Sequence, residues 1–405
     1  MKRHGLIGLT LVAGMMLATV GCSGSQGGTS TKDALQVAFL GTFSGVTSSG
    51  NATMKDAVEA WAEEVNANGG LDGHHVDLIV KDVAGPTGTN VNVAKSVIAQ
   101  KVDAILDVDE GSTQWLNLAE QAKIPVITSS SFAQVVYKSV FPVFGDSPAQ
   151  TYMIASAAKM IGPKMAIGYA SEAQSAAEYA AQVKSFGKNV GVSVVVSAEL
   201  SSSQPDYTAF CQLLKTSGVN EYFLALSTAT AQKVTNQCYQ QGVRLPQVLL
   251  GYQTSPALVK SAAYQGSIAQ DLTAPFFDTS VPAVAVYRSA MKKYAPSVLG
   301  TDKDSSAGTM GWSLAEMLSY AVKHGGGITS ADIFKGLYTA KNETLGGLIA
   351  PVTYVEGKNT SIGCAFVWAI RSQDYTLTTN GIKPVCAPAG LVASADAEIA
   401  KSLDQ

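Results

Sequence analysis

Polar side chains follow several short apolar runs in the first third of the chain, at the positions where those runs end. Hydroxyl groups and free backbone amides at strand ends and helix starts donate hydrogen bonds to small polar ligands, and carboxylates accept them. The candidate ligand-binding residues in this part of the chain are Phe43, Ser44, Glu110, Ser112, Ser130, Ser131 and Phe132. Helix capping is the competing interpretation for the serines, and above all for Ser112.

Two aromatic residues, Tyr169 and Tyr252, end later apolar runs and could stack on a ligand. Tyrosine joins a large apolar ring to a hydroxyl group, so ordinary core packing explains either residue equally well. We keep both as candidate ligand contacts, with packing as the alternative.

Motifs for catalysis and for cofactors are absent from the sequence. There is no GxGxxG after a strand and no GxxxxGK[ST], and GTFSG at 41–45 is not a GxSxG elbow. His74 and His75 lie in a turn and His324 lies near a helix end, and no CxxC spacing supports a metal site. We therefore expect a binding protein with no cofactor and no metal. A hydrolase that uses Glu110 as a base is the enzymatic alternative, and it predicts turnover of an amide or ester.

The candidate residues can form one site only if strands and helices bring them to the same edge of a sheet. Residues 35–40 form an apolar run, apolar residues recur at helical spacing from Met54 to Val65, and a second strand begins at Val76. Asn68 and the two glycines after it end the helix. Parallel strands joined through a helix place their following loops at the carboxyl edge of the sheet, where open α/β sheets bind ligands.

The same order of elements continues along the chain and predicts an α/β fold with two Rossmann-like lobes and parallel sheets. A helix at 91–98, a strand at 103–108, a helix at 115–122 and a strand at 124–128 complete the first series, and 140–144 suits a crossover. The second series has strands at 165–170, 193–198, 222–226 and 248–251, with helices at 148–161, 176–190, 205–216 and 229–241. Helices at 281–294, 305–324 and 330–340 and strand-like segments at 345–354, 364–370 and 375–378 follow.

The N-terminus predicts export. Lys2 and Arg3 precede an apolar run at 6–20 that is too short for a comfortable membrane span. The residues before Cys22 resemble a bacterial lipobox, so we expect a signal peptide at 1–21, a lipid on Cys22 and a flexible tether at 22–33; an ordinary secretory peptide is the alternative. The net charge of −3 gives no reason to invoke nucleic acid.

Four cysteines remain after Cys22, an even number that predicts disulfides in an oxidising compartment. Three connectivities are possible, and two local loops are the simplest. We expect Cys211–Cys238 and Cys364–Cys386, because Cys211 and Cys238 lie on consecutive predicted helices.

Several stretches are similar to one known family. GTFSG after the first strand, EEVNANGGLDG at the end of the first helix and KDV at the end of the second strand resemble the opening of type 1 periplasmic binding proteins, the branched-chain amino acid–binding family of ABC importers. GWSLAEMLSYAVKHGG at 311–326 and LGGLIAPVTYVEGKN at 345–359 resemble its late helix and closing hairpin. The resemblance implies a three-strand hinge and makes Tyr207, in QPDYTAF, a ligand contact. It implies a first lobe of 34–142 and 252–342, a second lobe of 143–251 and 343–390, and a tail at 391–405.

The resemblance also implies a function. The chain is expected to be a monomeric, extracytoplasmic protein that is anchored to the cell membrane by the lipid on Cys22. It would capture a small polar molecule by hinge closure and deliver it to an ABC permease. A ligand-sensing receptor domain of the same fold, without transport, is the alternative.

Three positions depart from the leucine-binding members of the family. Gly50 stands where they have an aromatic residue, Glu110 where a serine receives the carboxylate of the amino acid, and Ala229 where an acid pairs with the ammonium group. A carboxylate ligand would meet the like charge of Glu110. We therefore expect a neutral or cationic ligand, such as an amide, a urea-like compound or a polyol. Glu110 turned to solvent, or capping the helix near Ser112, is the competing interpretation.

Overall fold

The computed structural model describes residues 34–45, 48–84, 88–109, 115–129, 137–145, 147–172, 174–358, 360, 362–378, 381–394 and 397. The expected signal peptide, the lipid site at Cys22, the tether and most of the expected tail lie outside these residues. Of the helices that the structure describes, none has the length and apolar character needed to cross a membrane.

The first sheet contains five parallel strands in the order β2-β1-β3-β4-β5. Its strands are β1 (Ala34–Gly41), β2 (His75–Asp82), β3 (Ala104–Val108), β4 (Val126–Thr128) and β5 (Val140–Pro142). Strands β1, β2, β3 and β4 are those that the apolar runs predict. The doubly wound α/β prediction is confirmed for this lobe.

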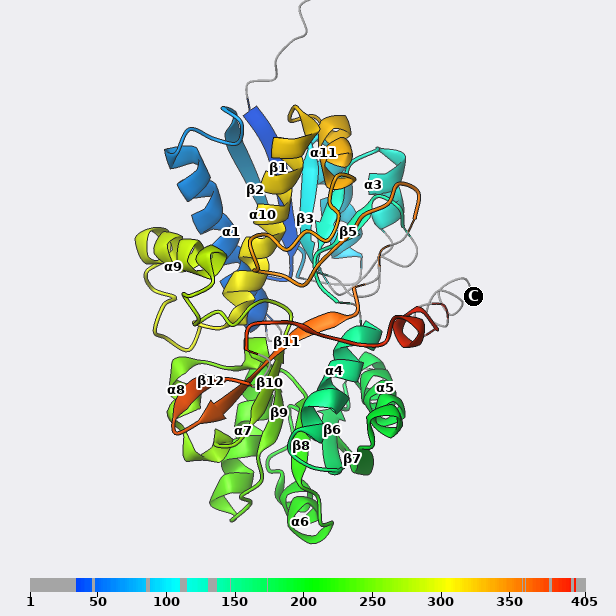
Figure 1. Cartoon of the computed structure of the whole chain (residues 1–405), viewed down its shortest axis with the longest axis vertical. Coiled ribbons are helices and arrows are strands. Elements are labelled where there is room, and N and C mark those ends of the chain that lie inside the picture. Colours follow the sequence, from blue (N-terminus) through cyan, green and yellow to red (C-terminus); the bar gives the residue numbers. More distant parts are fainter. Residues whose placement is uncertain are drawn as a thin grey trace, which may run out of the picture. The chain divides into compact units, whose positions relative to one another are not determined.

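Helices cover both faces of the first sheet. On one face lie α1 (Ser49–Ala67), α9 (Pro282–Tyr294), α10 (Ser306–Gly325) and α11 (Ser330–Leu337), and on the other lie α2 (Thr89–Ala99) and α3 (Leu116–Gln121). Figure 1 shows α9 and α10 beside α1 although more than half of the chain separates them from it. Alternate residues of β1 supply the two cores: Val37 and Phe39 face α1 and α10, whereas Ala38 and Leu40 face α2 and α3.

The second sheet has eight strands, ordered β12-β11-β10-β9-β8-β6-β7 with β13 paired to β11. They are β6 (Lys164–Ala170), β7 (Ser193–Leu200), β8 (Glu221–Ala225), β9 (Gln247–Leu250), β10 (Ile268–Asp271), β11 (Cys364–Arg371), β12 (Asp374–Leu377) and β13 (Val385–Cys386). Strands β6 to β10 run parallel, and β11 pairs antiparallel with β10, β12 and β13.

Helices also cover both faces of the second sheet. The helices α4 (Ser147–Lys159) and α5 (Gln174–Val190) pack on one face, and α6 (Thr208–Thr216) and α7 (Thr228–Gln240) pack on the other. The short elements η2 (Gly251–Gln253), α8 (Pro256–Lys260) and η3 (Ala262–Tyr264) connect β9 to β10. Helix α6 begins three residues after the Pro205 that we expected at its start.

The pairing of β10 and the core around 343–354 differ from the lobe boundaries that we expected. β10 joins β9 and β11 in the second sheet, so the chain leaves that sheet after Asp271 and not at Tyr252. Leu348, Val352 and Tyr354 belong to the core of the first lobe, where the Tyr354 hydroxyl donates to the Pro142 carbonyl oxygen at 2.7 Å. An apolar segment has no local feature that selects one of two sheets, because contacts distant in sequence make that choice.

Three segments, which we call the crossings, connect the lobes. The first follows β5, the second runs from Leu272 to α9, and the third runs from 355 to β11. The first and second leave the carboxyl ends of parallel strands. The third enters beside the carboxyl end of β10, where Phe366 pairs with Asp271. The crossings therefore lie at the carboxyl edges of the two sheets.

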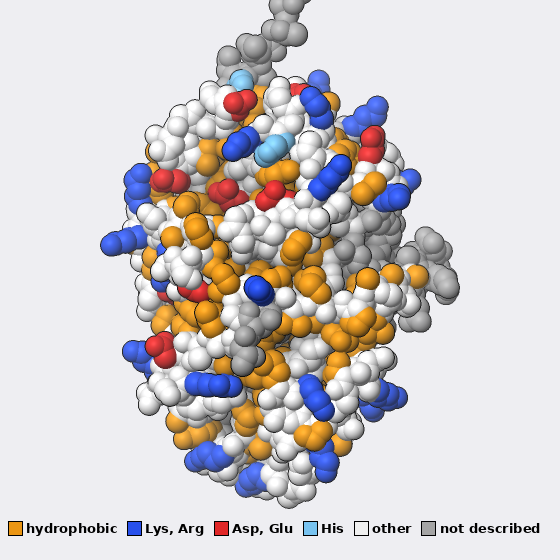
Figure 2. Space-filling model, in the orientation of Figure 1, with side chains coloured by type: hydrophobic (Ala, Val, Ile, Leu, Met, Phe, Trp, Pro, Cys, Tyr) orange, Lys and Arg blue, Asp and Glu red, His pale blue; other side chains and the backbone are white. Residues whose placement is uncertain are grey.

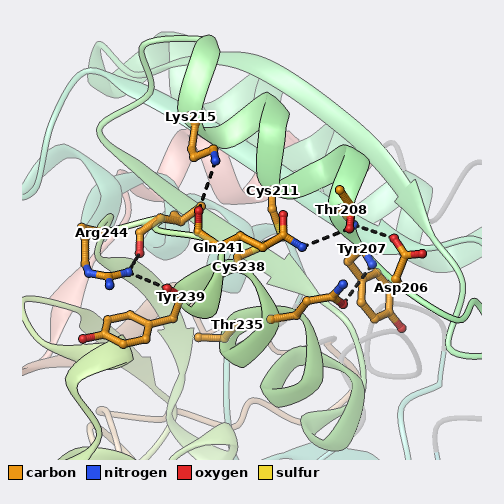
Figure 3. The surroundings of a disulfide bond; sticks show 12 residues. Asp206, Tyr207, Thr208, Cys211, Lys215, Thr235, Cys238, Tyr239, Gln241 and Arg244 are labelled. Atoms are coloured by element: carbon orange, nitrogen blue, oxygen red, sulfur yellow. Dashed lines mark hydrogen bonds between the residues drawn. A yellow bond between two sulfur atoms is a disulfide. The ribbon is translucent and has the colours of Figure 1, made fainter.

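Both expected disulfides are present, which confirms the local pairing. Cys211 of α6 is bonded to Cys238 of α7, and Figure 3 shows the two helices side by side with hydrogen bonds flanking the bridge. Cys364 and Cys386 are directly opposite each other in the β11–β13 pair. Both bridges lie in the second lobe.

Candidate functional site

The first loop at the carboxyl edge of the first sheet is anchored by Asp82, which ends β2. Its Oδ1 atom accepts the backbone N–H groups of Phe43 at 3.0 Å and Ala84 at 2.9 Å. Partial burial works to raise the pKa of Asp82, but hydrogen bonds from Ser44, Ala84 and Phe43 outweigh it and lower the pKa below its ordinary value. The Phe43 ring is half-buried 5.0 Å from the Phe39 ring, and Ser44 is exposed. Asp82 thus holds two predicted site residues in place.

A second polar group lies at the ends of β3 and β4. Asp107 accepts the Thr128 hydroxyl at 2.9 Å and the backbone N–H of Asp109 at 3.0 Å. Asp109 accepts a hydrogen bond at 2.9 Å from the side-chain amide of Asn90, which lies in the first turn of α2. These buried hydrogen bonds hold the backbone in place where β3 and β4 end. The expected site residues Glu110, Ser112, Ser130, Ser131 and Phe132 lie outside the described residues.

The second sheet presents Tyr169 at its carboxyl edge. Its hydroxyl donates to Glu199 of the neighbouring strand β7 at 3.4 Å, and the two residues are directly paired in the sheet. Burial and the Glu199 charge raise the pKa of Tyr169, so the hydroxyl stays protonated and able to donate. The side chain is half-buried, so a ligand at this edge could reach it.

An exposed carboxylate–serine cluster lies beside Tyr169. Glu172 follows β6, and its Oε1 atom accepts the Ser201 hydroxyl at 2.6 Å, the Ser202 N–H at 2.7 Å and the Ser202 hydroxyl at 3.0 Å. The Ser201 and Ser203 hydroxyls are 2.8 Å apart. Hydrogen bonds from the Ser201 hydroxyl and from backbone N–H groups lower the pKa of Glu172 to about 2. The cluster is a set of aligned donors and acceptors at the edge of the second sheet.

Tyr207 is placed in the core and not at the edge. Its ring is 1% exposed, its hydroxyl donates to the Ser201 carbonyl oxygen at 2.9 Å, and its N–H donates to Gln237 at 3.0 Å. The Lys233 ammonium group lies 5.2 Å from the ring centroid. Figure 3 shows Tyr207 at the start of α6, pointing away from the disulfide. The contacts of Tyr207 are those of a packing residue that supports the serine loop.

Tyr252 lies at the junction of the lobes. It belongs to η2, directly after β9, and is half-buried. It borders a cavity of about 10 Å³, which is room for about one water molecule. Residues of both lobes line that cavity: Gln150, Leu250, Gly251, Tyr252, Gln270, Asp271, Leu272 and Met310. This cavity is therefore too small to hold a solute larger than water.

A larger hollow of about 210 Å³ lies on the first lobe alone. Its lining residues come from α10 and the segment after α11, and are Glu316, Ser319, Tyr320, Lys323, His324, Glu343 and Leu345. Burial raises the pKa of Glu316 there to about 7. Because only one lobe contributes, closure of the lobes could not enclose a solute at this place.

Sequence patterns did not lead us to Asp82, Asn90, Asp107 or the cluster formed by Glu172 with Ser201–Ser203. A usable signal was present for most of them, since Asp82 ends a strand, Asp107 is the last residue but one of a strand, and Glu172 and Ser201–Ser203 follow strands. Asn90 lies instead in the first turn of a helix. In the part of the chain that the structure covers, no group of three His, Cys, Asp or Glu residues could hold a metal ion. Figure 2 shows lysine and arginine side chains spread over the visible face, not gathered in one patch.

Comparisons with known proteins agree with this architecture. A family model described as "Periplasmic binding protein" matches residues 34–374. No curated protein matches the chain. A branched-chain amino acid ABC transporter structure from Thermus thermophilus with bound valine has a TM-score of 0.76 at 15% identity, covering 90% of this chain and 99% of that one.

Two further solved structures are also similar. A branched-chain amino acid transporter substrate binding protein from Streptococcus pneumoniae in complex with isoleucine has a TM-score of 0.69 at 16% identity, covering 87% of this chain and 100% of that one. A solute binding protein of an ABC transporter from R. palustris in complex with benzoate has a TM-score of 0.69 at 14% identity, covering 88% and 98%. At these identities the likeness concerns the fold, while the family model spans well over half of the 405 residues. The chain therefore belongs to the type 1 periplasmic binding protein family.

Proposed function

We propose that this protein is an extracytoplasmic solute-binding protein of an ABC importer that captures a small polar molecule between its two lobes. The observation that carries the proposal is the position of the crossings at the carboxyl edges of both sheets. Loops with hydrogen-bonding groups lie at the same edges. Rotation about the crossings could bring the loops together around a solute, as in hinge closure. Family membership supports binding over catalysis.

The proposed site combines predicted and newly found residues. From the first lobe we assign Phe43 and Ser44, on the loop that Asp82 holds, together with the predicted Glu110, Ser112, Ser130, Ser131 and Phe132. From the second lobe we assign Tyr169 and Tyr252 and add Glu172 with Ser201–Ser203. We leave Tyr207 out because its hydroxyl already bonds to Ser201 and its ring is buried.

The proposed ligand is neutral or cationic, such as an amide, a urea-like compound or a polyol. Similar structures hold valine, isoleucine or benzoate, each of which carries a carboxylate. Here the family position for the carboxylate is Glu110, and two like charges at about 4 Å cost roughly 4 kcal/mol at an effective dielectric near 20. Ala229, at the other pole, is exposed in the first turn of α7 and offers no anion to an ammonium group.

Native mass spectrometry of gently purified protein tests the proposal by identifying a retained small molecule. Calorimetry then compares leucine, isoleucine and valine with a panel of amides and polyols. We expect binding among the amides or polyols and weak binding of the amino acids. Submicromolar leucine binding that Glu110→Gln leaves unchanged would contradict the ligand class but leave solute binding intact. A protein that binds no small molecule in either experiment would contradict the function itself.

Closure and anchoring have separate tests. Small-angle scattering should show a smaller radius of gyration with the identified ligand, and an unchanged value at saturation argues against the hinge. We further propose that the protein is a monomer carrying a lipid on Cys22, which keeps it on the membrane beside its permease. Cys22→Ser should release the protein from the membrane fraction, and retention of that variant would exclude the anchor.

A further inference from the structure

A buried carboxyl group joins the second crossing to two strands of the second sheet. Asp271 ends β10 and is 2% exposed. Its Oδ1 atom accepts the N–H groups of Leu272 at 2.8 Å and Thr273 at 3.5 Å, the first two residues of the second crossing. Its Oδ2 atom accepts the indole N–H of Trp368 at 3.2 Å, on the strand that the third crossing enters. One side chain thus holds the second crossing against the strand that follows the third.

The contacts continue directly into the first lobe. Thr273 forms an antiparallel bridge with Ile349, in the segment that precedes the third crossing. The Thr273 hydroxyl lies 2.7 Å from the Thr309 hydroxyl of α10, a helix of the first lobe. Hinge motion is absorbed by a few residues at the ends of elements. The Asp271 carboxyl group therefore acts where rotation of one lobe against the other must bend the chain.

The surroundings of the carboxyl group are close-packed and carry no charge. A side chain at Gly251 of η2 would overlap the carboxyl group, so glycine is needed there. Ser306 of α10 faces the carboxyl group, and Tyr252 and Gln270 border the adjoining small cavity with it. The Gln270 side-chain nitrogen is buried without a hydrogen-bond partner in the described structure.

Charged groups do not reach this carboxyl group. None of the ion pairs in the described part of the chain includes Asp271. The pair formed by Arg288 and Asp304 acts on Tyr287 and Tyr375 instead. Burial raises the pKa of Asp271 to about 7, against the opposing effect of the Trp368, Thr273 and Leu272 hydrogen bonds.

We propose that the protonation state of Asp271 controls the stiffness of the hinge between the two lobes. The carboxylate accepts all three N–H groups and holds the end of β10, the start of the second crossing and β11 together. Protonation at Oδ2, the oxygen with a single N–H donor, turns an acceptor into a hydroxyl group and weakens the Trp368 contact. Acidification then loosens the junction between the lobes, while the carboxylate form stiffens it. This inference rests on the hinge closure proposed above.

The test follows the indole N–H signal of Trp368 by ¹H–¹⁵N NMR in the full chain between pH 5 and 9. Trp368→Phe assigns the signal. We expect one inflection near pH 7 for Trp368. Tyr375, whose ring packs against Trp368, has a pKa raised by burial and so does not titrate in this range.

Asp271→Asn keeps the shape and removes the titration, so the Trp368 signal of this variant should not depend on pH. A flat wild-type titration overturns the proposal, and so does an inflection that survives in the Asn variant. If the Asn variant does not fold, the wild-type titration still decides, because a carboxylate bonded to the indole must move that signal when it takes up a proton. Hydrogen exchange at Leu272 and Thr273 adds a second readout. Protection should fall in wild type from pH 8 to pH 6, relative to the Asn variant.

Discussion

The buried glutamate at the start of β8 allows a sharp test of the energetics of this fold. The Glu221 side chain is 0% exposed, and neither carboxyl oxygen has a hydrogen-bond partner in the described structure. Burial raises the pKa of Glu221 from 4.5 to about 8. An ionised carboxyl group without a partner is costly to bury, so the folded protein holds this group in its neutral form. We expect Glu221→Gln to stabilise the protein at neutral pH.

The magnitude follows from linkage. A carboxyl group whose pKa is raised by folding leaves stability intact below its unfolded pKa of 4.5, and stability is lost as pH rises towards about 8. At pH 7 the unfolded chain has gained ionisation free energy over 2.5 pH units, the difference between 7 and 4.5, while the folded chain has gained almost none. At about 1.4 kcal/mol per pH unit, this amounts to about 3 kcal/mol. A glutamine side chain does not titrate, so the Glu221→Gln variant should avoid this loss.

Urea unfolding followed by tryptophan fluorescence measures the effect at several pH values from 4.5 to 8. The advantage of Glu221→Gln over wild type should grow by about 3 kcal/mol between pH 4.5 and 7. Glu63→Gln, at an exposed position of α1, is the matched control and should show no such growth. Parallel stability curves for wild type and Glu221→Gln would refute the reasoning.

Two further predictions concern covalent and packing constraints. Replacing Cys211 and Cys238 together by serine should lower the free energy of unfolding by roughly 3–4 kcal/mol, because the bridge closes a loop across 27 residues; an unchanged urea midpoint would contradict this. Gly311→Ala should destabilise by about 1–3 kcal/mol, because its Cβ would overlap the Met54 carbonyl oxygen where α10 meets α1. Gly50→Ala, also helical but with open space around it, should stabilise by about 0.5 kcal/mol. Thermal unfolding shifts of the same sign for both glycine variants would refute this pair.

Local patterns predicted most of the secondary structure. The apolar run at 35–40 became β1, and the stripe from Met54 to Val65 became the buried side of α1. These predictions succeed because the period of the apolar residues depends on the geometry of the element itself. The disulfide between Cys211 and Cys238 was predictable for a similar reason, since consecutive helices on one face of a parallel sheet lie side by side.

The candidate site was predictable only in part. Phe43 and Tyr169 lie at the carboxyl edges of the two sheets, as their positions near predicted strand ends indicated. The burial of Tyr207 was not predictable, because an aromatic residue at a helix start can point to a ligand or to the core. The pairing of Glu172 with Ser201 was also missed, because it joins loops that are neighbours only once β6 and β7 have paired.

The sequence by itself determined the alternation of strands and helices, the export signal it predicts and the order of elements typical of the family, because all of these are properties of contiguous residues. Only the tertiary structure decided that β10 joins the second sheet and that 343–354 packs in the first lobe. The tertiary structure also decided that Asp271 and Glu221 are buried with no positively charged group acting on them. The physical reason is that sheet membership and desolvation depend on contacts between residues far apart in the chain, and a local pattern carries no information about such contacts.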